Sequence, residues 1–277
     1  MLECGKTVQK LIIQEMCCNW LLKKQRKVFV RSVMRIAVIA DIHANYEALE
    51  AVLGRISALG ANEIICLGDV VGYNANPNEC VDFVRHKKII CVLGNHDACA
   101  AGLEEPDGFN PLARTALFWT REHLTKENSM FLMTRPRGHL LQDFYLFHGT
   151  IFNLHRYLID RNDALENFLL LSELPGGPRI GFFGHSHIKT AFSLGKAGVE
   201  IEETLDLPLS PDKRYLINPG SVGQPRDSDP RAAFLVYDNV DRRVTFYRVK
   251  YDVKACQKKI LSAGLPPQHA ERLAWGR

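Results

Sequence analysis

Hydrophobic positions along the chain alternate between short apolar runs, typical of buried strands, and stretches of helical period. Apolar runs at 35–40, 63–67 and 89–93 predict three strands. Between the first two, apolar residues from Tyr46 to Ile56 share one face of a helix, and Pro77 opens a second helix that reaches Arg85. This order predicts a β-α-β-α-β unit with right-handed crossovers.

The pattern continues to the end of the chain. Helices are predicted over 111–124, 163–171 and 253–263, and strands over 139–142, 144–147 and 179–183. The stretch from the last of these strands to the final helix is rich in further strands. The stretch between Asn95 and His148 is longer than a connecting loop needs. We therefore expect one domain over residues 34–277, with a helical cap insertion near 98–138.

Residues 1–33 have a different character and are predicted to be an extension outside the fold. Their apolar part is too short to span a membrane, and a basic cluster follows it, which is the reverse of a secretory signal peptide. Apolar residues at helical spacing leave a helix at a membrane surface as an alternative. The run from Met34 into the first strand resembles a natural amino terminus.

Five short polar clusters occur in order along the chain, and four of them directly follow an apolar run. They are Asp41-Ile42-His43, Gly68-Asp69, Gly94-Asn95-His96-Asp97, His148-Gly149 and Gly184-His185-Ser186-His187. Because side chains that follow neighbouring strands meet at one edge of a sheet, we expect these clusters to converge. Carboxylates, imidazoles and one amide form a mixed N/O ligand set suited to two divalent first-row metals.

Two cations about 3.5 to 4 Å apart need a shared ligand, and the carboxylate of Asp69 is placed to bridge them. Asp41 and His43, two positions apart, project the same way if the chain stays extended beyond its strand. His185 and His187 have the same spacing, and Gly184 would let the backbone bend. Any one such cluster is commonly a helix cap or a turn, so the prediction depends on the ordered set.

These clusters give the chain a resemblance to the calcineurin-like metallophosphoesterases, and more closely to their small bacterial-type phosphodiesterase and phosphatase branch, over residues 34–250. The resemblance implies a four-layer α/β/β/α sandwich with a dimetal site at the sheet edge. It also implies two ligand sets that share one residue: Asp41, His43, Asp69 and His187 for one metal, and Asp69, Asn95, His148 and His185 for the other.

The resemblance further implies a role for His96 as general acid or transition-state stabiliser, with Asp97 orienting it. A histidine with a pKa near 6.5 can give up a proton at neutral pH, which suits departure of an alcohol.

Substrate contacts are predicted outside the ligand clusters. The segment 218–227 is a second similarity to the same branch, and the guanidinium fork of Arg226 would suit a phosphate oxygen. The alternative is a structural turn in which Arg226 pairs with a neighbouring aspartate. Arg114 could line a cap over the metals, and Asn45 could contact substrate.

Composition adds limits on class and location. The chain of 277 residues is 46% apolar and 24% charged, as expected for a globular protein. The net charge of +4 comes from the basic residues of 1–33, so the body offers no clear nucleic-acid surface. The eight cysteines form no C-x-x-C pair, which fits the reducing cytoplasm better than a disulfide framework.

The sequence thus predicts a hydrolase of phosphate mono- or diesters that uses a hydroxide bridging two divalent metal ions. Mn²⁺ is the expected metal, with Fe, Ni, Co or Zn as alternatives, and the substrate is a small phosphorylated compound, with nucleotides among the candidates. The alternatives are a dinucleoside polyphosphate hydrolase, a Ser/Thr protein phosphatase and a non-catalytic scaffold of this fold. The complete ligand set and His96 argue against the scaffold.

Overall fold

The computed structural model describes residues 34–141 and 143–277. The predicted extension at residues 1–33, its alternative as a membrane-surface helix, and the end of the predicted strand at residue 142 lie outside the described residues.

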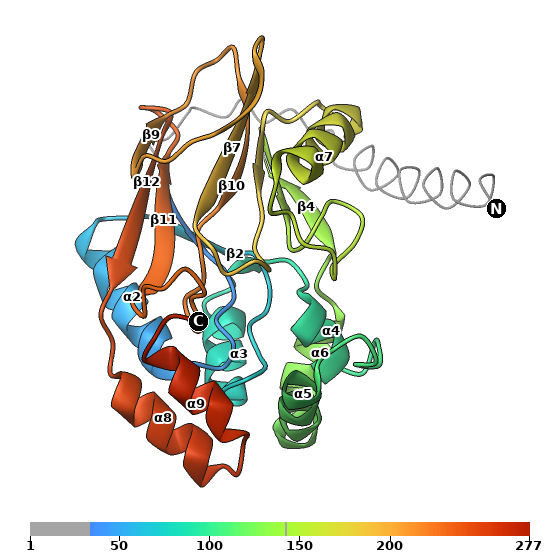
Figure 1. The fold of residues 1–277 in the computed structure, drawn as a ribbon, viewed down its shortest axis with the longest axis vertical. Coiled ribbons are helices and arrows are strands. Elements are labelled where there is room, and N and C mark those ends of the chain that lie inside the picture. Colours follow the sequence, from blue (N-terminus) through green and yellow to red (C-terminus); the bar gives the residue numbers. More distant parts are fainter. Residues whose placement is uncertain (1–33, 142) are drawn as a thin grey trace, which may run out of the picture.

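Two six-stranded sheets form the centre of the molecule (Figure 1). The first sheet has the order β3-β2-β1-β11-β12-β9, in which β1, β2 and β3 run parallel and β11 pairs antiparallel to β1. Its strands are β1 (Arg35–Ile39), β2 (Glu63–Cys66), β3 (Ile90–Cys91), β9 (Asp206–Pro208), β11 (Ala232–Asp238) and β12 (Arg243–Val249). The parallel half is the predicted β-α-β-α-β unit, which is confirmed.

The second sheet has the order β4-β5-β6-β10-β7-β8, with β5, β6 and β10 parallel at its centre. Its strands are β4 (Gly138–Leu141), β5 (Phe144–Phe147), β6 (Ile180–Phe182), β7 (Thr190–Gly195), β8 (Gly198–Ile201) and β10 (Arg214–Asn218). The ends of β5 and β6 therefore open in the same direction, each followed by a predicted histidine cluster.

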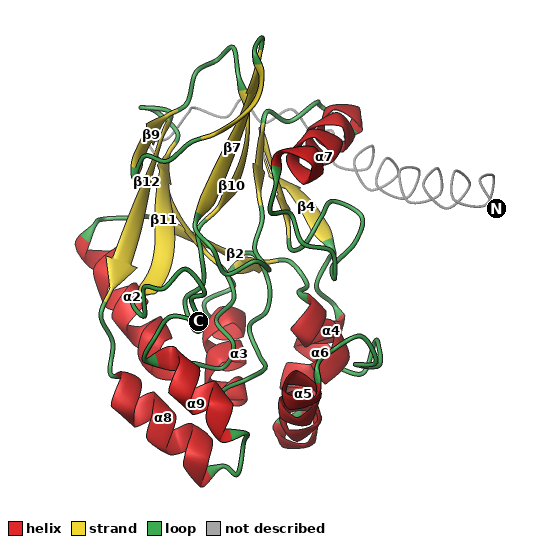
Figure 2. Cartoon of the chain, viewed as in Figure 1, coloured by secondary structure: helices red, strands yellow, loops and turns green. Residues whose placement is uncertain are grey.

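Helices cover the outer faces of both sheets and gather at one end of the molecule (Figure 2). The helices are α2 (Tyr46–Ala58), α3 (Pro77–His86), α4 (Asn95–Ala100), α5 (Pro111–His123), α6 (Lys126–Met133), α7 (Arg161–Glu173), α8 (Val253–Ser262) and α9 (Pro267–Leu273). Apolar residues of α2 and α3 pack on the first sheet, and those of α7 pack on the second. Helices α5, α8 and α9 share a smaller apolar cluster.

The alternating pattern of β1 shows why the layers stack in this order. Ala37 and Ile39 face the helices α2 and α3, whereas Ile36 and Val38 face the second sheet. All four side chains are buried, so β1 is apolar on both faces, as the uninterrupted apolar run predicted. The result is helix, sheet, sheet and helix, which confirms the predicted four-layer α/β/β/α sandwich.

Most predicted elements occur within a residue or two of their expected ends, and three helices were not predicted. Helix α5 and the strand β5 agree closely with the predicted 111–124 and 144–147. The unpredicted helices are α4, α6 and α9, which have six to eight residues each and therefore too few turns to show a helical period. None of the helices of the described residues is long and apolar enough to cross a membrane.

The contact between the two sheets should dominate the stability of the fold. The ring of Phe182 is fully buried between the sheets. Its centroid lies 5.5 Å from that of the Phe144 ring and 5.9 Å from that of the Tyr237 ring on the facing sheet. We expect Phe182→Ala to lower the free energy of unfolding by about 3–5 kcal/mol, because it leaves a cavity between the sheets. Leu261→Ala on the exposed face of α8 is the control and should change it by less than about 0.5 kcal/mol. Urea denaturation followed by circular dichroism measures both, and equal effects would contradict the prediction.

Candidate metal centre

The predicted ligand clusters all converge at the ends of the central parallel strands. Asp41 and His43 follow β1, Asp69 follows β2, and Asn95 begins α4 just beyond β3. From the second sheet, His148 follows β5, and His185 and His187 follow β6. All these side chains are buried, with at most 6% of each residue exposed. The structure therefore brings together the whole set that the sequence singled out.

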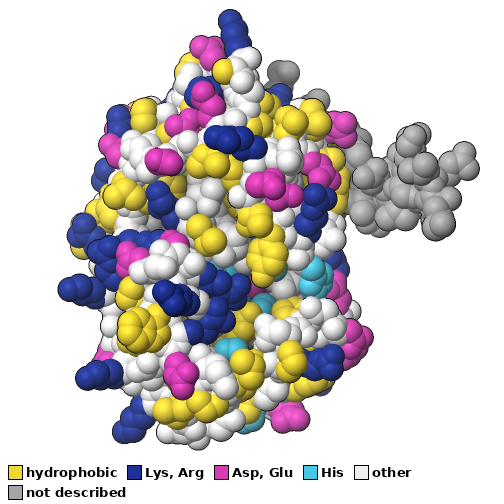
Figure 3. Space-filling view, viewed as in Figure 1, with side chains coloured by type: hydrophobic (Ala, Val, Ile, Leu, Met, Phe, Trp, Pro, Cys, Tyr) yellow, Lys and Arg dark blue, Asp and Glu magenta, His cyan; other side chains and the backbone are white. Residues whose placement is uncertain are grey.

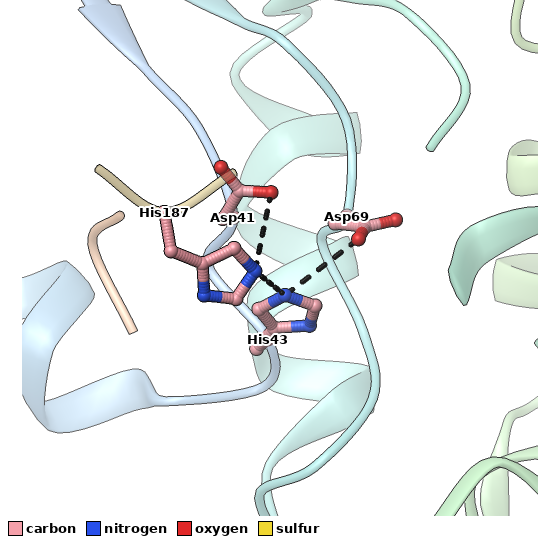
Figure 4. Close-up of side chains that lie close together, drawn as sticks. All are labelled: Asp41, His43, Asp69 and His187. Carbon is pink, nitrogen blue, oxygen red and sulfur yellow. Dashed lines mark hydrogen bonds and ion pairs between the residues drawn. The ribbon is translucent and has the colours of Figure 1, made fainter. Parts of the chain in front are cut away.

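Four of these residues form the first donor cluster, shown in Figure 4. The Nε2 atoms of His43 and His187 lie 3.0 Å apart. A carboxylate oxygen of Asp69 lies 3.6 Å from Nε2 of His43, and one of Asp41 lies 3.7 Å from Nε2 of His187. Two carboxylates and two imidazoles thus point their donor atoms at a common centre.

A second cluster shares Asp69 with the first and adds His148 and His185. Nε2 of His148 lies 3.2 Å from Oδ2 of Asp69 and 3.0 Å from Oδ1 of Asn95. The amide oxygen of Asn95 therefore faces the same space as these imidazoles. Asp69 is the only residue that belongs to both clusters within the described part of the chain.

Backbone carbonyl oxygens fix which nitrogen of each histidine faces inward. Nδ1 of His43 bonds Val71 O at 2.9 Å, and Nδ1 of His148 bonds Leu67 O at 2.8 Å. Because a carbonyl can only accept, each Nδ1 carries a proton and each Nε2 faces the centre, where it can offer a lone pair to a cation.

The histidines after β6 are held in two different ways. Nδ1 of His187 donates to Gln224 O at 2.6 Å, so its Nε2 also faces inward. His185 is turned over, because its Nε2 donates to His155 O at 3.2 Å and leaves Nδ1 as the free donor atom. The two residues therefore offer different ring nitrogens despite their identical spacing from Ser186.

The donor atoms of the two clusters are suited to binding divalent cations. Nε2 of His43 and Nε2 of His187 lie 3.0 Å apart, and burial lowers the pKa of both histidines, so two lone pairs face one another. Two facing lone pairs are unfavourable in a protein interior. A cation between them would satisfy both, and the buried carboxylates of Asp41 and Asp69 would offset its charge.

The backbone at the site is strained, which corrects one expectation. Five of the candidate ligands have positive φ in the left-handed region: Asp41 at 53°, His43 at 48°, Asp69 at 52°, His185 at 69° and His187 at 60°. The spacing of Asp41 and His43 was expected to place them on one side of an extended chain, but the chain does not stay extended beyond β1. It turns sharply at each ligand, at a cost of about 1 kcal/mol or more for each such residue.

Two glycines allow neighbouring groups to approach the backbone closely, and neither is needed to bend it. A Cβ on Gly94 would lie 2.1 Å from Oδ1 of Asp69, so a side chain there would displace the shared carboxylate. Gly184 was expected to bend the chain, but the positive φ angles belong to the histidines after it. A Cβ on Gly184 would instead lie 3.2 Å from Asp41 and 3.3 Å from His148.

Burial and the close carboxylates set the protonation of the site. Burial lowers the pKa of His43 to about 3 and that of His185 to about 3, so both imidazoles are neutral. Burial also opposes charge on His148, but attraction to Asp69 outweighs it and raises the pKa of His148 to about 9. In the protein without cations, His148 therefore holds a proton that a metal would displace.

His96 lies beside the donor clusters but outside both of them. Its backbone N–H donates to Oδ1 of Asp69 at 2.8 Å, and its ring packs on Tyr73 and edge-on to Phe109. Its Nδ1 is buried without a hydrogen-bond partner. Burial holds the pKa of His96 well below its usual range, so the imidazole is neutral.

Asp97 does not bond the His96 ring, which corrects the expected contact. One carboxylate oxygen of Asp97 accepts from the N–H groups of Val70 and Val71 at 2.9 and 3.1 Å, and the other accepts from Gly94 N at 3.2 Å. Asp97 thus ties the loop after β2 to the loop after β3. It acts on the backbone that carries Asp69 and Asn95.

A cavity of about 490 Å³ opens beside the centre, and its walls include Asp69, Asn95, His96, His185 and His187. Arg226 lines the cavity as well. The alternative pairing is not seen, because Asp227 bonds Arg248 and Asp229 pairs with Arg231 at 2.6 Å.

Two other predicted contacts lie elsewhere. Asn45 is fully buried, where its side chain caps α2 through Ala48 N and donates to Gly223 O at 2.9 Å. Arg114 is on the exposed face of α5 and is not part of the cavity wall. Neither is placed to touch substrate.

The cavity wall also contains residues that the sequence analysis did not select, among them His155, Tyr157 and Arg272. The first two lie in the connection between β5 and α7, and Arg272 lies in α9. No motif marks these positions, because their place in the wall depends on how remote segments pack.

Comparison with known proteins gives the same family for most of the chain. Residues 34–241 match the Calcineurin-like phosphoesterase superfamily domain. The chain is 40% identical over 251 residues to the uncharacterized protein MJ0912 of Methanocaldococcus jannaschii, covering 87% of this chain and 98% of that protein.

Solved structures show the same fold. A metallophosphoesterase from Sphaerobacter thermophilus is 37% identical with a TM-score of 0.77, covering 89% of this chain and 100% of that one. The hypothetical protein PH1004 from Pyrococcus horikoshii is 20% identical with a TM-score of 0.72, covering 88% and 99%. The sequence match, the shared fold and the buried Asp/His clusters agree, and this chain therefore belongs to the calcineurin-like phosphoesterase superfamily.

Proposed function

We propose that this protein is a dinuclear metal-dependent phosphoesterase that hydrolyses phosphate mono- or diesters. The observation that carries the proposal is the pair of buried donor clusters that share Asp69. One oxygen of the shared carboxylate accepts from the backbone of His96, and the other lies 3.2 Å from Nε2 of His148 and 3.6 Å from Nε2 of His43. Such a group is suited to bridging two cations.

The two clusters suggest which residues would hold each cation. Asp41, His43, Asp69 and His187 would hold one, and Asp69, Asn95, His148 and His185 would hold the other. When bound, two divalent cations would lower the pKa of a water shared between them and polarise the phosphoryl oxygens. The mixed N/O donor set is compatible with Mn²⁺, the proposed metal, and with Fe, Ni, Co or Zn as alternatives.

Other residues of the cavity would act on the substrate directly. Arg226 would donate to a phosphoryl oxygen, because its Nε is buried without a partner in a wall of the cavity. His96 would serve as a neutral hydrogen-bond donor to the departing or equatorial oxygen, since its low pKa makes it a poor carrier of an extra proton. Asp97 would support His96 only through the backbone.

The cavity also bears on the alternatives and on the chain as a whole. A volume of about 490 Å³ suits a small phosphorylated compound, and this favours such substrates over a phosphoprotein. A dinucleoside polyphosphate hydrolase would use the same centre on an anhydride. A scaffold without catalytic activity would not require buried donor atoms on a strained backbone.

We further propose a single domain over residues 34–277 and a cytoplasmic location.

Removal of the shared carboxylate tests the centre itself. We expect Asp69→Asn to lose bound metal and to lower metal-stimulated hydrolysis of bis(p-nitrophenyl) phosphate about 10³-fold, equal to ~4 kcal/mol of transition-state stabilisation. Elemental analysis of protein purified with Mn²⁺ and initial rates measure the two effects. Asp212→Asn, which changes an exposed carboxylate in a turn, is the matched control. Full metal content in Asp69→Asn would refute the bridge.

The role of His96 predicts a change in rate without a change in metal content. His96→Asn should lower kcat about 10²-fold or more, because one donor to the transition state is lost, and it should leave bound metal unchanged. His86→Asn, at the exposed end of α3, controls for loss of a histidine. If His96→Asn instead lost metal, His96 would be a ligand and the proposed role would be wrong.

The affinity for metal should rise with pH from about pH 6 to pH 9. His148 with its pKa of about 9 and Asp41 with its pKa of about 7 are both protonated in the lower part of this range when no cation is bound. A cation must displace those protons, so binding strengthens as pH rises and levels off above the higher pKa. Calorimetric titration with Mn²⁺ in buffers of different ionisation enthalpy measures the protons released. An affinity that is independent of pH over this range would contradict the prediction.

A further inference from the structure

Two arginine side chains line the cavity outside the donor clusters. Arg226 comes from the loop after β10, and Arg272 comes from α9 near the end of the chain. On the face seen in Figure 3, blue arginine and lysine side chains lie beside cyan histidine side chains in a hollow of the surface. Positively charged side chains therefore lie beside the histidines at this hollow.

Arg226 has hydrogen bonds only to neutral groups. Its Nη2 donates to the hydroxyl of Tyr73 at 3.2 Å and to the side-chain oxygen of Gln224 at 3.1 Å. Its Nε is buried and has no partner. A half-buried guanidinium held in this way keeps donors free for a ligand.

Arg272 forms no ion pair with an aspartate or glutamate of the described residues. Its Nε donates to the main-chain oxygen of Arg277, which is a carboxylate oxygen where the chain ends at this residue, so its Nη groups are the ones left for a ligand. Arg226 likewise forms no such ion pair within the described part of the chain. By contrast, Arg231 and Arg248 on the surface nearby are both paired with Asp229.

The two guanidinium groups repel one another across the cavity wall. Burial lowers the pKa of Arg272, and the charge of Arg226 lowers it further. Two like charges in a partly desolvated space favour binding of an anion near them. Glu105 also lines the cavity but pairs with Arg121 at 3.1 Å, so it does not offset either arginine through an ion pair.

The two arginines reach the cavity from different elements. The backbone N–H of Arg226 donates to the main-chain oxygen of His187 at 3.2 Å, which places Arg226 next to a candidate ligand. Arg272 lies on α9, which packs against α5 and α8. Arg226 is therefore the arginine beside the position proposed for the reacting phosphoryl group.

The space between them suits an organic group. Tyr157 is 45% exposed, lines the cavity and stacks on the His185 ring at 4.3 Å with an angle of 20°. Phe109 lines the same cavity and contacts His96 and His155 edge-on. These rings give apolar surface next to the two charges, as a phosphorylated organic substrate requires.

We propose that Arg272, in the same cavity wall as Arg226, forms a second anion subsite that binds a phosphate group carried by the leaving group of the substrate. The natural substrate is then a small organic compound with two phosphate groups, one held at the metal centre and one at Arg272. This inference rests on the proposed phosphoesterase function and adds the class of substrate to it.

Anion binding without metal tests the subsite independently of turnover. Inorganic pyrophosphate is titrated calorimetrically into EDTA-treated protein, and we expect saturable binding to the wild type. Arg272→Gln should weaken it about tenfold, because one charge-assisted donor pair is lost. Arg272→Lys keeps the charge but loses the fork, and we expect it to weaken binding about threefold.

The control is Arg231→Gln, which removes the same charge from an exposed arginine already paired with Asp229. Its pyrophosphate affinity should stay within about twofold of the wild type. Thermal unfolding of all four proteins verifies folding. Absence of pyrophosphate binding to the wild type, or equal weakening by Arg272→Gln and Arg231→Gln, would overturn the subsite.

Turnover gives a second readout on metal-loaded enzyme with a matched pair of substrates. Adenosine 3′,5′-bisphosphate carries one phosphate more than adenosine 5′-monophosphate. Arg272→Gln should lower kcat/KM about tenfold for the bisphosphate, through KM, and leave that for the monophosphate within about twofold. Equal losses on both substrates would refute the subsite. Failure of the wild type to hydrolyse any ester, with pyrophosphate binding intact, would refute only the proposed phosphoesterase function.

Discussion

The buried carboxylate of Asp69 is the group on which the rest of the site depends. It is 1% exposed, it accepts from the backbone of His96 at 2.8 Å, and its other oxygen faces His148 at 3.2 Å and His43 at 3.6 Å. Burial alone would raise the pKa of Asp69, but the surrounding histidines hold it well below the usual range. A charge in this position is stable only if the surrounding atoms compensate it, and those atoms come from both sheets.

The backbone around Asp69 is organised to keep that geometry. Asp97 binds three backbone N–H groups of the two loops that carry Asp69 and Asn95. The loop after β10 does the same for the other side, because Ser221 donates to Asp41 O and Gln224 O accepts from His187. Left-handed conformations at five ligands are tolerated because these bonds fix the loops from outside.

Helices remote from the metal centre in sequence complete the cavity. Helix α9 is held against α5 and α8 by a small apolar cluster, and it brings Arg272 into the wall. Glu104, just beyond α4, accepts from His155 at 2.6 Å and so links the segment between α4 and α5 to the connection after β5. The donor atoms thus come from residues at the ends of strands, whereas the remaining cavity walls are built mainly by helices and loops.

The sequence by itself determined the strands, the main amphipathic helices and the identity of the seven candidate ligands, because these are local properties. A buried strand must be apolar, and a ligand must stand where that strand ends, as at Asp41 after β1. Only the tertiary structure decided which ring nitrogen of His185 faces inward, that Asp97 binds backbone amides, and that Asn45 caps a helix while Arg272 lines the cavity. Each of these features depends on a partner that is distant in the chain. Such a contact forms only when the layers pack, so a local sequence pattern does not reveal it.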